Sequence, residues 1–292
     1  MHFTEPVYRN PYWPTYPLIQ ITQGCTHNRC AFCSMYKGVP FRMMKIEDIE
    51  ADAKEIAQEM PHAKTIQLLS ANPLALSFEN LSSRLEAIRR HLPELEFMYA
   101  ATRVSDIKNK TVEQLKSLRD LGVREISLGV ESGDDWTLER IRKGYCAADI
   151  VEQCKKLEEA GIDYWVTFLN GVAGRSHSRE HAVHTAEIFN QLKPMTVGTG
   201  GLTLFADTPL LADAERGAFD PLDEKGLMEE LLTFLETLEC DCRLITHHTS
   251  SMNLNTDDFR TNKAAVLSAL KDGIAHLDMT ALSRRRQAKR TL

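Results

Sequence analysis

The chain has 292 residues, of which 43% are hydrophobic and 26% charged, an ordinary composition for a globular protein with a sizeable core. Its formal net charge is −6, whereas general binding to nucleic acid favours a basic surplus. No stretch approaches the roughly 20 apolar residues that cross a bilayer, and residues 1–10 lack the apolar run of a signal peptide. We therefore expect a cytoplasmic protein that does not bind membranes.

Short apolar runs alternate with segments of helical period from Leu18 onward. The runs are rich in Ile, Leu, Val, Thr, Tyr and Phe, as buried parallel strands are. They span residues 18–23, 65–70, 96–102, 125–130, 163–169 and 195–200. Six successive strand–helix units predict an α/β fold, a partial (βα)6 barrel of parallel strands whose site forms at the carboxyl ends of the strands. We expect one core at 17–239, with a short N-terminal extension (1–16) and a C-terminal extension (240–292).

The segments between the runs predict amphipathic helices. Their apolar residues step by three and four, which places one hydrophobic stripe on each helix. The clearest examples are residues 46–60, 78–92 and 227–238. Thr111 and Gln114 have the spacing of a capping box at the start of another helix. Gly122 and Gly161 each stand after a helical segment and before a strand, so we expect them to end helices in the left-handed conformation.

Three of the seven cysteines are crowded into nine residues directly after the first predicted strand. An odd total and this crowding are unlike a disulfide framework, so metal ligation explains Cys25, Cys30 and Cys33 better. Three thiolates on one loop would leave one iron of a four-iron cluster open to a substrate or cofactor. The alternatives are a zinc site with His27 as fourth ligand, and three cysteines without a metal.

The stretch from Leu18 to Tyr36 resembles the cysteine motif of the radical S-adenosylmethionine superfamily. Phe32 supplies the aromatic residue that precedes the third cysteine there, although the commonest spacing, Cys-x3-Cys-x2-Cys, is one residue shorter than Cys-x4-Cys-x2-Cys here. Residues 126–133 resemble the Gly-hydrophobic-Glu-Ser-Gly motif of the branch with methylthiotransferases, Elongator-like enzymes and anaerobic coproporphyrinogen dehydrogenases. Two further segments, 168–174 and 202–210, resemble that branch's glycine-bearing cofactor motif and its segment ending in Thr-Pro-Leu.

This resemblance implies a [4Fe-4S] cluster held by Cys25, Cys30 and Cys33, with S-adenosylmethionine bound at the open iron. Reductive cleavage of that cofactor would give a 5′-deoxyadenosyl radical, which would take a hydrogen atom from an unidentified small-molecule substrate. The enzyme would be an oxidoreductase or a transferase, and a flavodoxin or ferredoxin would supply the electron. The alternatives are an RNA-modifying enzyme of the same superfamily that acts on tRNA, and a zinc-binding interaction protein.

The resemblance also implies which residues contact S-adenosylmethionine. Asn72 would accept hydrogen bonds from the methionine amino group, although the acidic residue of the family is missing at this strand end. Arg103 would pair with the carboxylate, Glu131 and Ser132 would bind the ribose, and Gly171 would allow close approach of the backbone. Polar turns and a solvated arginine are the structural alternatives. The full expected set is Phe32, Asn72, Arg103, Glu131, Ser132, Asn170 and Gly171.

Other signals are weaker. Tyr36 and Arg42 lie near the cysteine loop and are candidates for assisting a product radical. Four further cysteines could in principle bind a second metal, although Cys154 lies on a helical apolar stripe and is expected to act as a small hydrophobe. The basic run at 284–290 is expected to be a solvated helix end. The remaining three cysteines are Cys146, Cys240 and Cys242.

Overall fold

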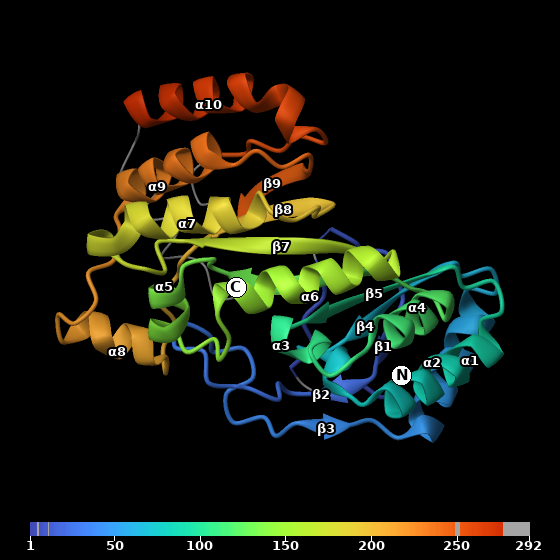
Figure 1. The fold of residues 1–292 in the computed structure, drawn as a ribbon. Helices are drawn as coiled ribbons and strands as arrows, with labels where there is room; N and C mark the ends of the chain where they lie inside the picture. The colour runs from blue at the N-terminus through green and yellow to red at the C-terminus, as the bar shows by residue number, and fades with distance from the viewer. Residues whose placement is uncertain (5, 11, 249–251, 277–292) are drawn as a thin grey trace. The chain divides into compact units, whose positions relative to one another are not determined.

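The computed structural model describes residues 1–4, 6–10, 12–248 and 252–276. The chain divides into two compact units. Unit 1 consists of Met1–Asn28, Tyr36–Gly129 and Gln153–Tyr164, and unit 2 of Arg29–Met35, Val130–Glu152 and Trp165–Leu292. Figure 1 labels the helices and strands of both units.

The strands of unit 1 are parallel and follow the order β1-β4-β5-β6. Their bounds are β1 Leu18–Gln20, β4 Thr65–Leu69, β5 Phe97–Thr102 and β6 Val123–Glu131, and the last two residues of β6 belong to unit 2. Ile19, Ile66 and Met98 are fully buried. The helices that accompany these strands are α1 Ile46–Glu59, α2 Phe78–His91, α3 Val104–Ile107 and α4 Val112–Asp120, with a short 3₁₀ turn at Pro73–Ala75.

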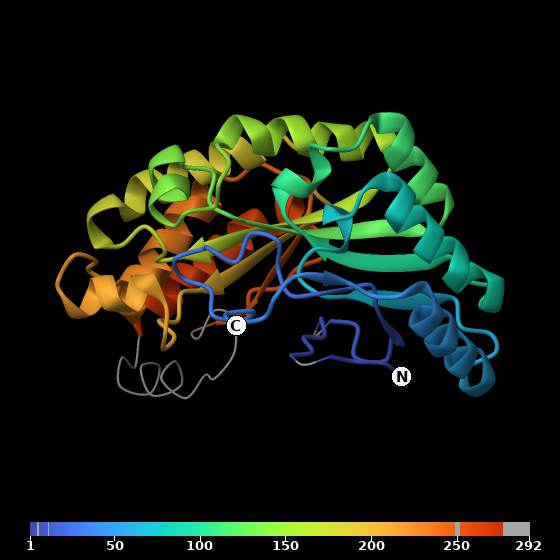
Figure 2. The same ribbon diagram turned by 90° about the horizontal axis from the view of Figure 1, so that it is seen from below.

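The N-terminal segment lies on the face of these strands opposite α2 (Figure 2). Buried glutamines on the strands hold it there, because the Thr4 N–H donates to Gln20 Oε1 (2.8 Å) and the Asn10 N–H donates to Gln67 Oε1 (3.2 Å). A strand face that carries glutamines rather than aliphatic residues therefore receives backbone donors in place of an apolar helix.

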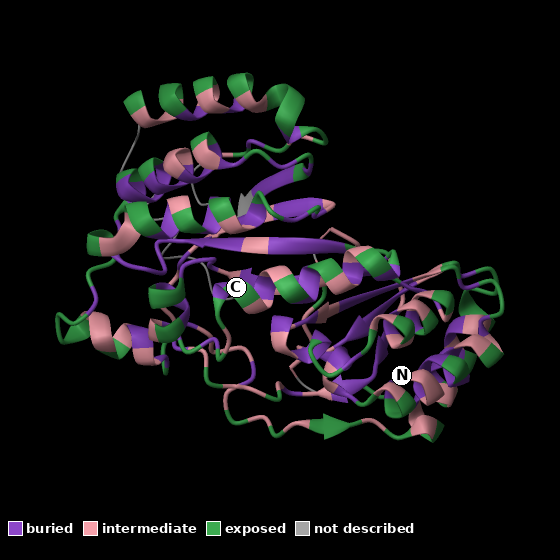
Figure 3. Cartoon of the chain, in the orientation of Figure 1, coloured by how far each residue is buried: buried purple, intermediate pink, exposed green. Residues whose placement is uncertain are grey.

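The strands of unit 2 are also parallel, in the order β7-β8-β9. They are β7 Asp163–Asn170, β8 Thr196–Gly201 and β9 Arg243–His248, and the first two residues of β7 belong to unit 1. The accompanying helices are α5 Asp135–Arg140, α7 Ser178–Phe189, α8 Pro209–Glu215, α9 Glu224–Thr237 and α10 Phe259–Ala275. Helix α6, Ala147–Ala160, begins in unit 2 and belongs to unit 1 from Gln153 onward. Figure 3 shows β7 and β8 mostly buried, whereas α10 keeps a long exposed face.

The sequence predicted the alternation of parallel strands and helices correctly, but two strand assignments were wrong. The first run does not continue in the parallel sheet to Gln23, because Ile21 accepts a hydrogen bond from the Met44 N–H (3.0 Å). Residues Thr22–Gln23 (β2) instead pair antiparallel with Arg42–Met43 (β3). Strand β9 was not predicted, since residues after 240 were expected only as an extension. The division into 1–16, 17–239 and 240–292 stays a prediction, and the basic run at 284–290 lies outside the described residues.

The predicted helix boundaries are confirmed where a specific residue defines them. Thr111 accepts a hydrogen bond from the Gln114 N–H (3.2 Å), and Gln114 Oε1 accepts one from the Thr111 N–H (3.1 Å), which is the reciprocal pair of a capping box. Gly122 and Gly161 have φ values of 113° and 71°, so both adopt the left-handed conformation expected after a helix.

Candidate cofactor site

Two of the three clustered cysteines, Cys30 and Cys33, lie in unit 2 on a loop that is held by its backbone. The Ala31 N–H donates to the Ile141 carbonyl and the Ala31 carbonyl accepts from the Leu210 N–H, both at 2.9 Å. Cys30 and Cys33 are partly buried free thiols packed against an apolar cluster. The members of this cluster are Ala31, Phe32, Ile141, Leu169, Val172, Leu202, Leu210 and Phe219.

A buried cation lies near Cys33. The Lys143 side chain is only 4% exposed, and its Nζ lies 5.9 Å from the centre of the Phe32 ring and 3.7 Å from Glu131 Oε1. Burial raises the pKa of the Cys33 thiol to about 11, although the charge of Lys143 acts in the opposite direction. Lys143 therefore offsets negative charge on a thiolate at Cys33 and on Glu131. This role could not be predicted from the residues around Lys143, because it arises from tertiary packing.

Cys25 lies in unit 1, and polar residues at the end of β4 hold its neighbours on both sides. The Ser70 hydroxyl donates to the Gly24 carbonyl at 2.9 Å. The Asn72 Nδ2 donates to Thr26 Oγ1 at 2.5 Å, and Asn72 Oδ1 accepts from the Thr26 N–H at 3.4 Å. The neighbours of Cys25 are thus held by side chains that follow β4 and lie 46 residues further along the chain.

Asn72 is fully buried, and both of its amide hydrogens have acceptors. The second acceptor is Asp106 Oδ2, at 3.1 Å, which also accepts from Thr102 Oγ1 and the Arg103 N–H. Asn72 therefore positions the cysteine loop, and a contact of its Oδ1 with S-adenosylmethionine stays a prediction, as does the pairing of Arg103 with a carboxylate. Asp106 was not predicted as a site residue, since its only signal in the sequence is an acidic residue in the first turn of α3.

Glu131 ends β6 in a conformation that favours glycine, with a φ of 68°. A non-glycine residue in this region stores strain of order 1–3 kcal/mol, and such residues are concentrated at functional sites. The Thr167 hydroxyl, on β7 in unit 2, donates to Glu131 Oε2 at 3.1 Å and accepts from the Glu131 N–H at 3.2 Å. Ser132 is fully buried, and its Oγ accepts from the Asp134 N–H at 3.0 Å. The carboxylate of Glu131 is therefore oriented by Thr167 and Lys143.

Asp134 connects the turn after β6 to α7 and to the short 3₁₀ turn Arg175–His177. It caps α5 by accepting from the Thr137 N–H (2.9 Å), and it also contacts His177 Nε2 (3.0 Å) and His184 Nδ1 (2.7 Å). Burial alone would raise the pKa of Asp134, but the hydrogen bonds from Thr137 and His184 and the charge of His177 outweigh it and lower this pKa to about 2. The carboxylate form is thus the one that the fold stabilises.

Asn170 and Gly171 form the turn at the carboxyl end of β7. The Asn170 Nδ2 donates to the Leu227 carbonyl on α9 at 3.0 Å, and the buried Asn170 Oδ1 has no hydrogen-bond partner among the described residues. Gly171 has a φ of 83°, and a Cβ there would lie 2.6 Å from Leu227 Cδ2. This turn requires glycine, and it leaves one buried acceptor unused by the protein.

The two candidates for assisting a product radical have different environments. Tyr36 is buried in unit 1, with its ring centre 5.3 Å from that of Tyr8 in an edge-to-face arrangement. Arg42 is exposed on β3. Nothing in these environments assigns either side chain a chemical role, and both stay predictions.

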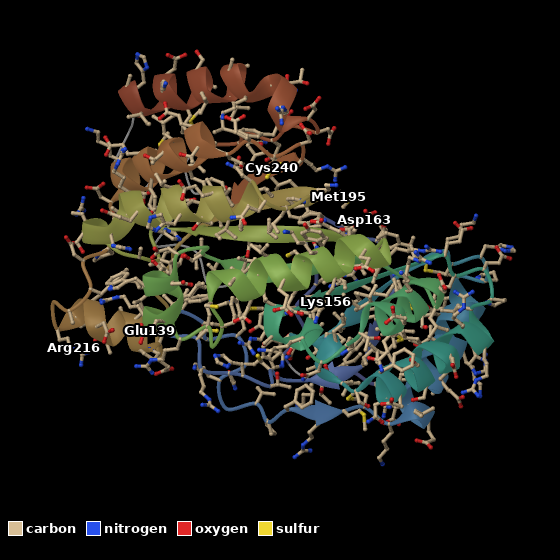
Figure 4. The ribbon with its side chains drawn as sticks, in the orientation of Figure 1. Glu139, Lys156, Asp163, Met195, Arg216 and Cys240 are labelled. Carbon is tan, nitrogen blue, oxygen red and sulfur yellow. The ribbon has the colours of Figure 1, made fainter. Side chains whose placement is uncertain are left out.

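Of the remaining cysteines, Cys240 and Cys242 are buried in unit 2 and Cys146 is exposed. Cys240 Sγ donates to the Phe189 carbonyl at 2.9 Å, and burial raises the pKa values of Cys240 and Cys242 to about 12. Figure 4 shows Cys240 and Met195 on one side of unit 2, and Glu139 on α5 and Arg216 after α8 on the other. The backbone hydrogen bonds of Ala31 are made with Ile141, which follows α5, and with Leu210, in the first turn of α8. Cys154 is fully buried, as expected of a small hydrophobe.

Within residues 1–4, 6–10, 12–248 and 252–276, no group of three or more His, Cys, Asp or Glu side chains is arranged to hold one metal ion. The zinc site with His27 stays an alternative, since Cys25 and His27 belong to unit 1 and Cys30 and Cys33 to unit 2. The thiolates of a [4Fe-4S] cluster bind different iron atoms, so their sulfurs lie farther apart than the ligands of a single ion.

Comparison with known proteins decides the family. Residues 19–189, more than half of the chain, match the family described as the Radical SAM superfamily. The chain belongs to the radical SAM superfamily. The predicted cofactors, a [4Fe-4S] cluster and S-adenosylmethionine, are those of this superfamily. The residues described above fit them, because free thiols lie beside a buried cation and Asn170 Oδ1 is a buried acceptor without a partner.

Two curated relatives are similar to part of the chain. The heme chaperone HemW of Bacillus subtilis is 24% identical over 173 residues, which are 56% of this chain and 44% of that protein. The tRNA-2-methylthio-N(6)-dimethylallyladenosine synthase of Chlorobium luteolum is 22% identical over 173 residues, 56% of this chain and 37% of that protein. The chain thus spans less than half the length of these relatives.

Solved structures confirm the predicted fold class, the partial (βα)6 barrel of parallel strands. The radical S-adenosylmethionine methyltransferase TsrM from Kitasatospora setae has a TM-score of 0.56 at 20% identity, over 70% of this chain and 37% of that chain. Methylornithine synthase (PylB) has a TM-score of 0.52 at 15% identity, over 92% of this chain and 85% of that chain.

No helix among the described residues has the length and apolar character to span a membrane.

Proposed function

We propose that this chain is a radical S-adenosylmethionine enzyme that uses Cys25, Cys30 and Cys33 as the three protein ligands of its [4Fe-4S] cluster. The observation that carries this proposal is the Ala31 backbone clamp, which presents Cys30 and Cys33 as free, half-buried thiols beside Lys143. When bound, the cluster and S-adenosylmethionine supply a one-electron cleavage of the C5′–S bond that yields methionine and a 5′-deoxyadenosyl radical able to take a hydrogen atom from the substrate.

The protein's part is to hold the cofactors and exclude water. Phe32 and its apolar neighbours cover one side of the cysteine loop, and Lys143 offsets the negative charge of the thiolates. Glu131, oriented by Thr167, is suited to accept hydrogen bonds from ribose hydroxyls, with Ser132 beside it. Asn170 Oδ1 is suited to accept a hydrogen bond, and Gly171 lets the backbone approach the cofactor closely. Asn72 and Arg103 are proposed to meet the methionine amino group and carboxylate.

We propose a small-molecule substrate and a flavodoxin or ferredoxin as the source of the low-potential electron. The reaction is an oxidation, rearrangement or group transfer that follows hydrogen abstraction. A tRNA substrate is the weaker alternative, because the net charge of −6 gives no electrostatic support for RNA binding. The two curated relatives are named for different molecules, heme and tRNA, so their names do not favour one substrate class.

Anaerobic reconstitution with iron and sulfide tests the proposal. The wild-type protein is expected to bind about four iron atoms per chain, to absorb broadly in the visible range, and to release 5′-deoxyadenosine from S-adenosylmethionine when dithionite is added. Cys30→Ala is expected to lose both the visible absorption and the cleavage. The matched control is Cys146→Ala, because Cys146 is exposed and outside the loop, and it should behave as wild type. Retained cleavage in Cys30→Ala would refute the ligand assignment.

A further inference from the structure

The turn proposed to bind S-adenosylmethionine is held from behind by a buried carboxylate. Glu230, on α9, accepts a hydrogen bond from the Gly171 N–H through Oε2. Its other oxygen, Oε1, lies 3.1 Å from His181 Nδ1 on α7. The side chains of Glu230 and His181 are both 0% exposed. Two helices that pack side by side in Figure 1 therefore meet at the backbone of this turn through one polar chain of contacts.

One face of α9 contacts the end of β7 through three residues. Leu227, Glu230 and Phe234 follow at spacings of three and four, which places them on the same side of the helix. The Leu227 carbonyl accepts from Asn170, Glu230 accepts from Gly171, and Phe234 stacks on Phe168 with ring centres 4.1 Å apart. The Asn170–Gly171 turn is thus attached to α9 at two adjacent residues, and Phe168 of β7 adds a third contact.

His181 completes this arrangement. Its ring stacks on the Phe168 ring with centres 4.8 Å apart, so the orientation of the imidazole is fixed by packing as well as by Glu230. His181 Nε2 is buried and has no hydrogen-bond partner among the described residues. A buried carboxylate and a buried imidazole are costly, and apolar residues of similar size would stabilise a core at least as well. Core packing alone therefore does not account for this pair.

We propose that Glu230, with His181 behind it, is a positioning residue for S-adenosylmethionine binding. By fixing the direction of the Gly171 N–H, Glu230 sets the orientation of the preceding peptide and of the Asn170 side chain, whose free Oδ1 is the acceptor offered to the cofactor. The inference rests on the proposed function, since it needs the Asn170–Gly171 turn to contact S-adenosylmethionine. It adds α9 and α7, which neither cysteines nor glycine motifs identified, to the parts of the chain that govern cofactor affinity.

Two substitutions at Glu230 separate positioning from packing. Glu230→Gln keeps an oxygen acceptor for the Gly171 N–H and adds a donor for His181, whereas Glu230→Leu fills the space but leaves the Gly171 N–H unpaired. Glu229→Leu is the matched control, since Glu229 is the preceding residue of α9 and its side chain is 54% exposed. If Glu230→Leu does not fold, His181→Phe replaces it, because phenylalanine keeps the stacking on Phe168 and removes Nδ1.

The first measurement needs no cofactor. Hydrogen–deuterium exchange of the peptide that contains residues 170–172 is expected to be faster in Glu230→Leu or His181→Phe, and unchanged in Glu230→Gln and Glu229→Leu. The second is the dissociation constant of S-adenosylmethionine for the reconstituted protein. It should rise about tenfold in Glu230→Leu, the usual loss when a residue that orients a ligand-binding group is removed, while iron content and Tm stay as in wild type.

The outcomes are distinguishable. Unchanged affinity in Glu230→Leu, or a loss that Glu230→Gln does not rescue, would overturn the positioning role while leaving the proposed function intact. A parallel fall of iron content, Tm and affinity would show that Glu230 only stabilises the core, and would also overturn it. A wild-type protein that binds iron but no S-adenosylmethionine would overturn the proposed function and this inference together.

Discussion

Asp134 offers a test of electrostatics that does not depend on any cofactor. We consider Asp134→Asn, because asparagine is nearly isosteric, is an equally good helix N-cap and keeps the hydrogen bond from Thr137. It behaves as a carboxyl group that never ionises, so the hydrogen bonds from Thr137 lose the strength that the charge gives them, and the interactions of the charge with His184 and His177 are lost. The pKa of Asp134 is lowered from 3.8 to about 2, which corresponds to about 2 kcal/mol of stability from the ionised form.

The sign of the pH dependence follows from the lowered pKa. Since the folded protein holds the proton more weakly than the unfolded chain, the stabilisation is fully present above the unfolded pKa of 3.8 and is lost as the pH falls towards 2. The Asp134 side chain is 5% exposed, so solvent screens this contribution little. Asp134→Asn should be less stable than wild type by about 2 kcal/mol at pH 6 and by only about 1 kcal/mol at pH 3.

Urea denaturation of the cluster-free protein at several pH values between 6 and 3 measures this difference. The control is Asp258→Asn, because Asp258 also caps a helix, α10, but is exposed to solvent. Its difference from wild type should change much less with pH. A difference for Asp134→Asn that stays constant from pH 6 to pH 3 would refute the reasoning, since it would show that the charge of Asp134 is not the source of the stability.

Two further predictions concern the residues around the cysteine loop and the β7 turn. Gly171→Ala should destabilise the protein by about 2–5 kcal/mol, because its φ of 83° adds strain and its Cβ would lie 2.6 Å from Leu227. The control is Gly217→Ala, at a φ of 75° with open space around the Cβ, which should cost only about 1–2 kcal/mol. Urea denaturation measures both losses of stability. Equal losses for the two glycines would contradict the clash. Lys143→Met should lower the midpoint potential of the reconstituted cluster, because a buried positive charge favours the reduced state. An EPR-monitored redox titration measures this potential. The control is Lys155→Met, which should leave the potential unchanged because Lys155 is exposed. An unchanged or higher potential in Lys143→Met would argue against its position beside the cluster.

Much of the fold followed from local signals in the sequence. The capping box at Thr111 and the left-handed glycines Gly122 and Gly161 were predictable because each depends on its immediate neighbours along the chain. The change of partner at Ile21 was not, because the residues that pair with this segment, 42–44, lie across the cysteine loop. Strand β9 was not predicted, because its position beside β8 depends on a backbone hydrogen bond between residues 195 and 243, which are far apart in the sequence.

The candidate site shows the same division. Glycine and cysteine motifs identified residues by type, so Cys30, Glu131 and Gly171 could be proposed from sequence. The groups that orient them could not, because Lys143 and Glu230 resemble ordinary charged residues until the fold shows that they are buried. Asn72 shows a related limit, since the bonds from its amide nitrogen to Thr26 and Asp106 could not be predicted from sequence, while its expected contact with the cofactor stays a prediction.

The backbone clamp at Ala31 has a consequence for how iron would enter the protein. Because both main-chain groups of this residue are occupied within unit 2, the entropy of ordering its segment is lost when the polypeptide folds, before any metal arrives. The thiols of Cys30 and Cys33 would then be ordered before the cluster binds, so cluster binding would not have to order this segment. This order depends on backbone N–H and carbonyl groups, which every residue except proline carries. A comparison of side chains between sequences would therefore not detect it.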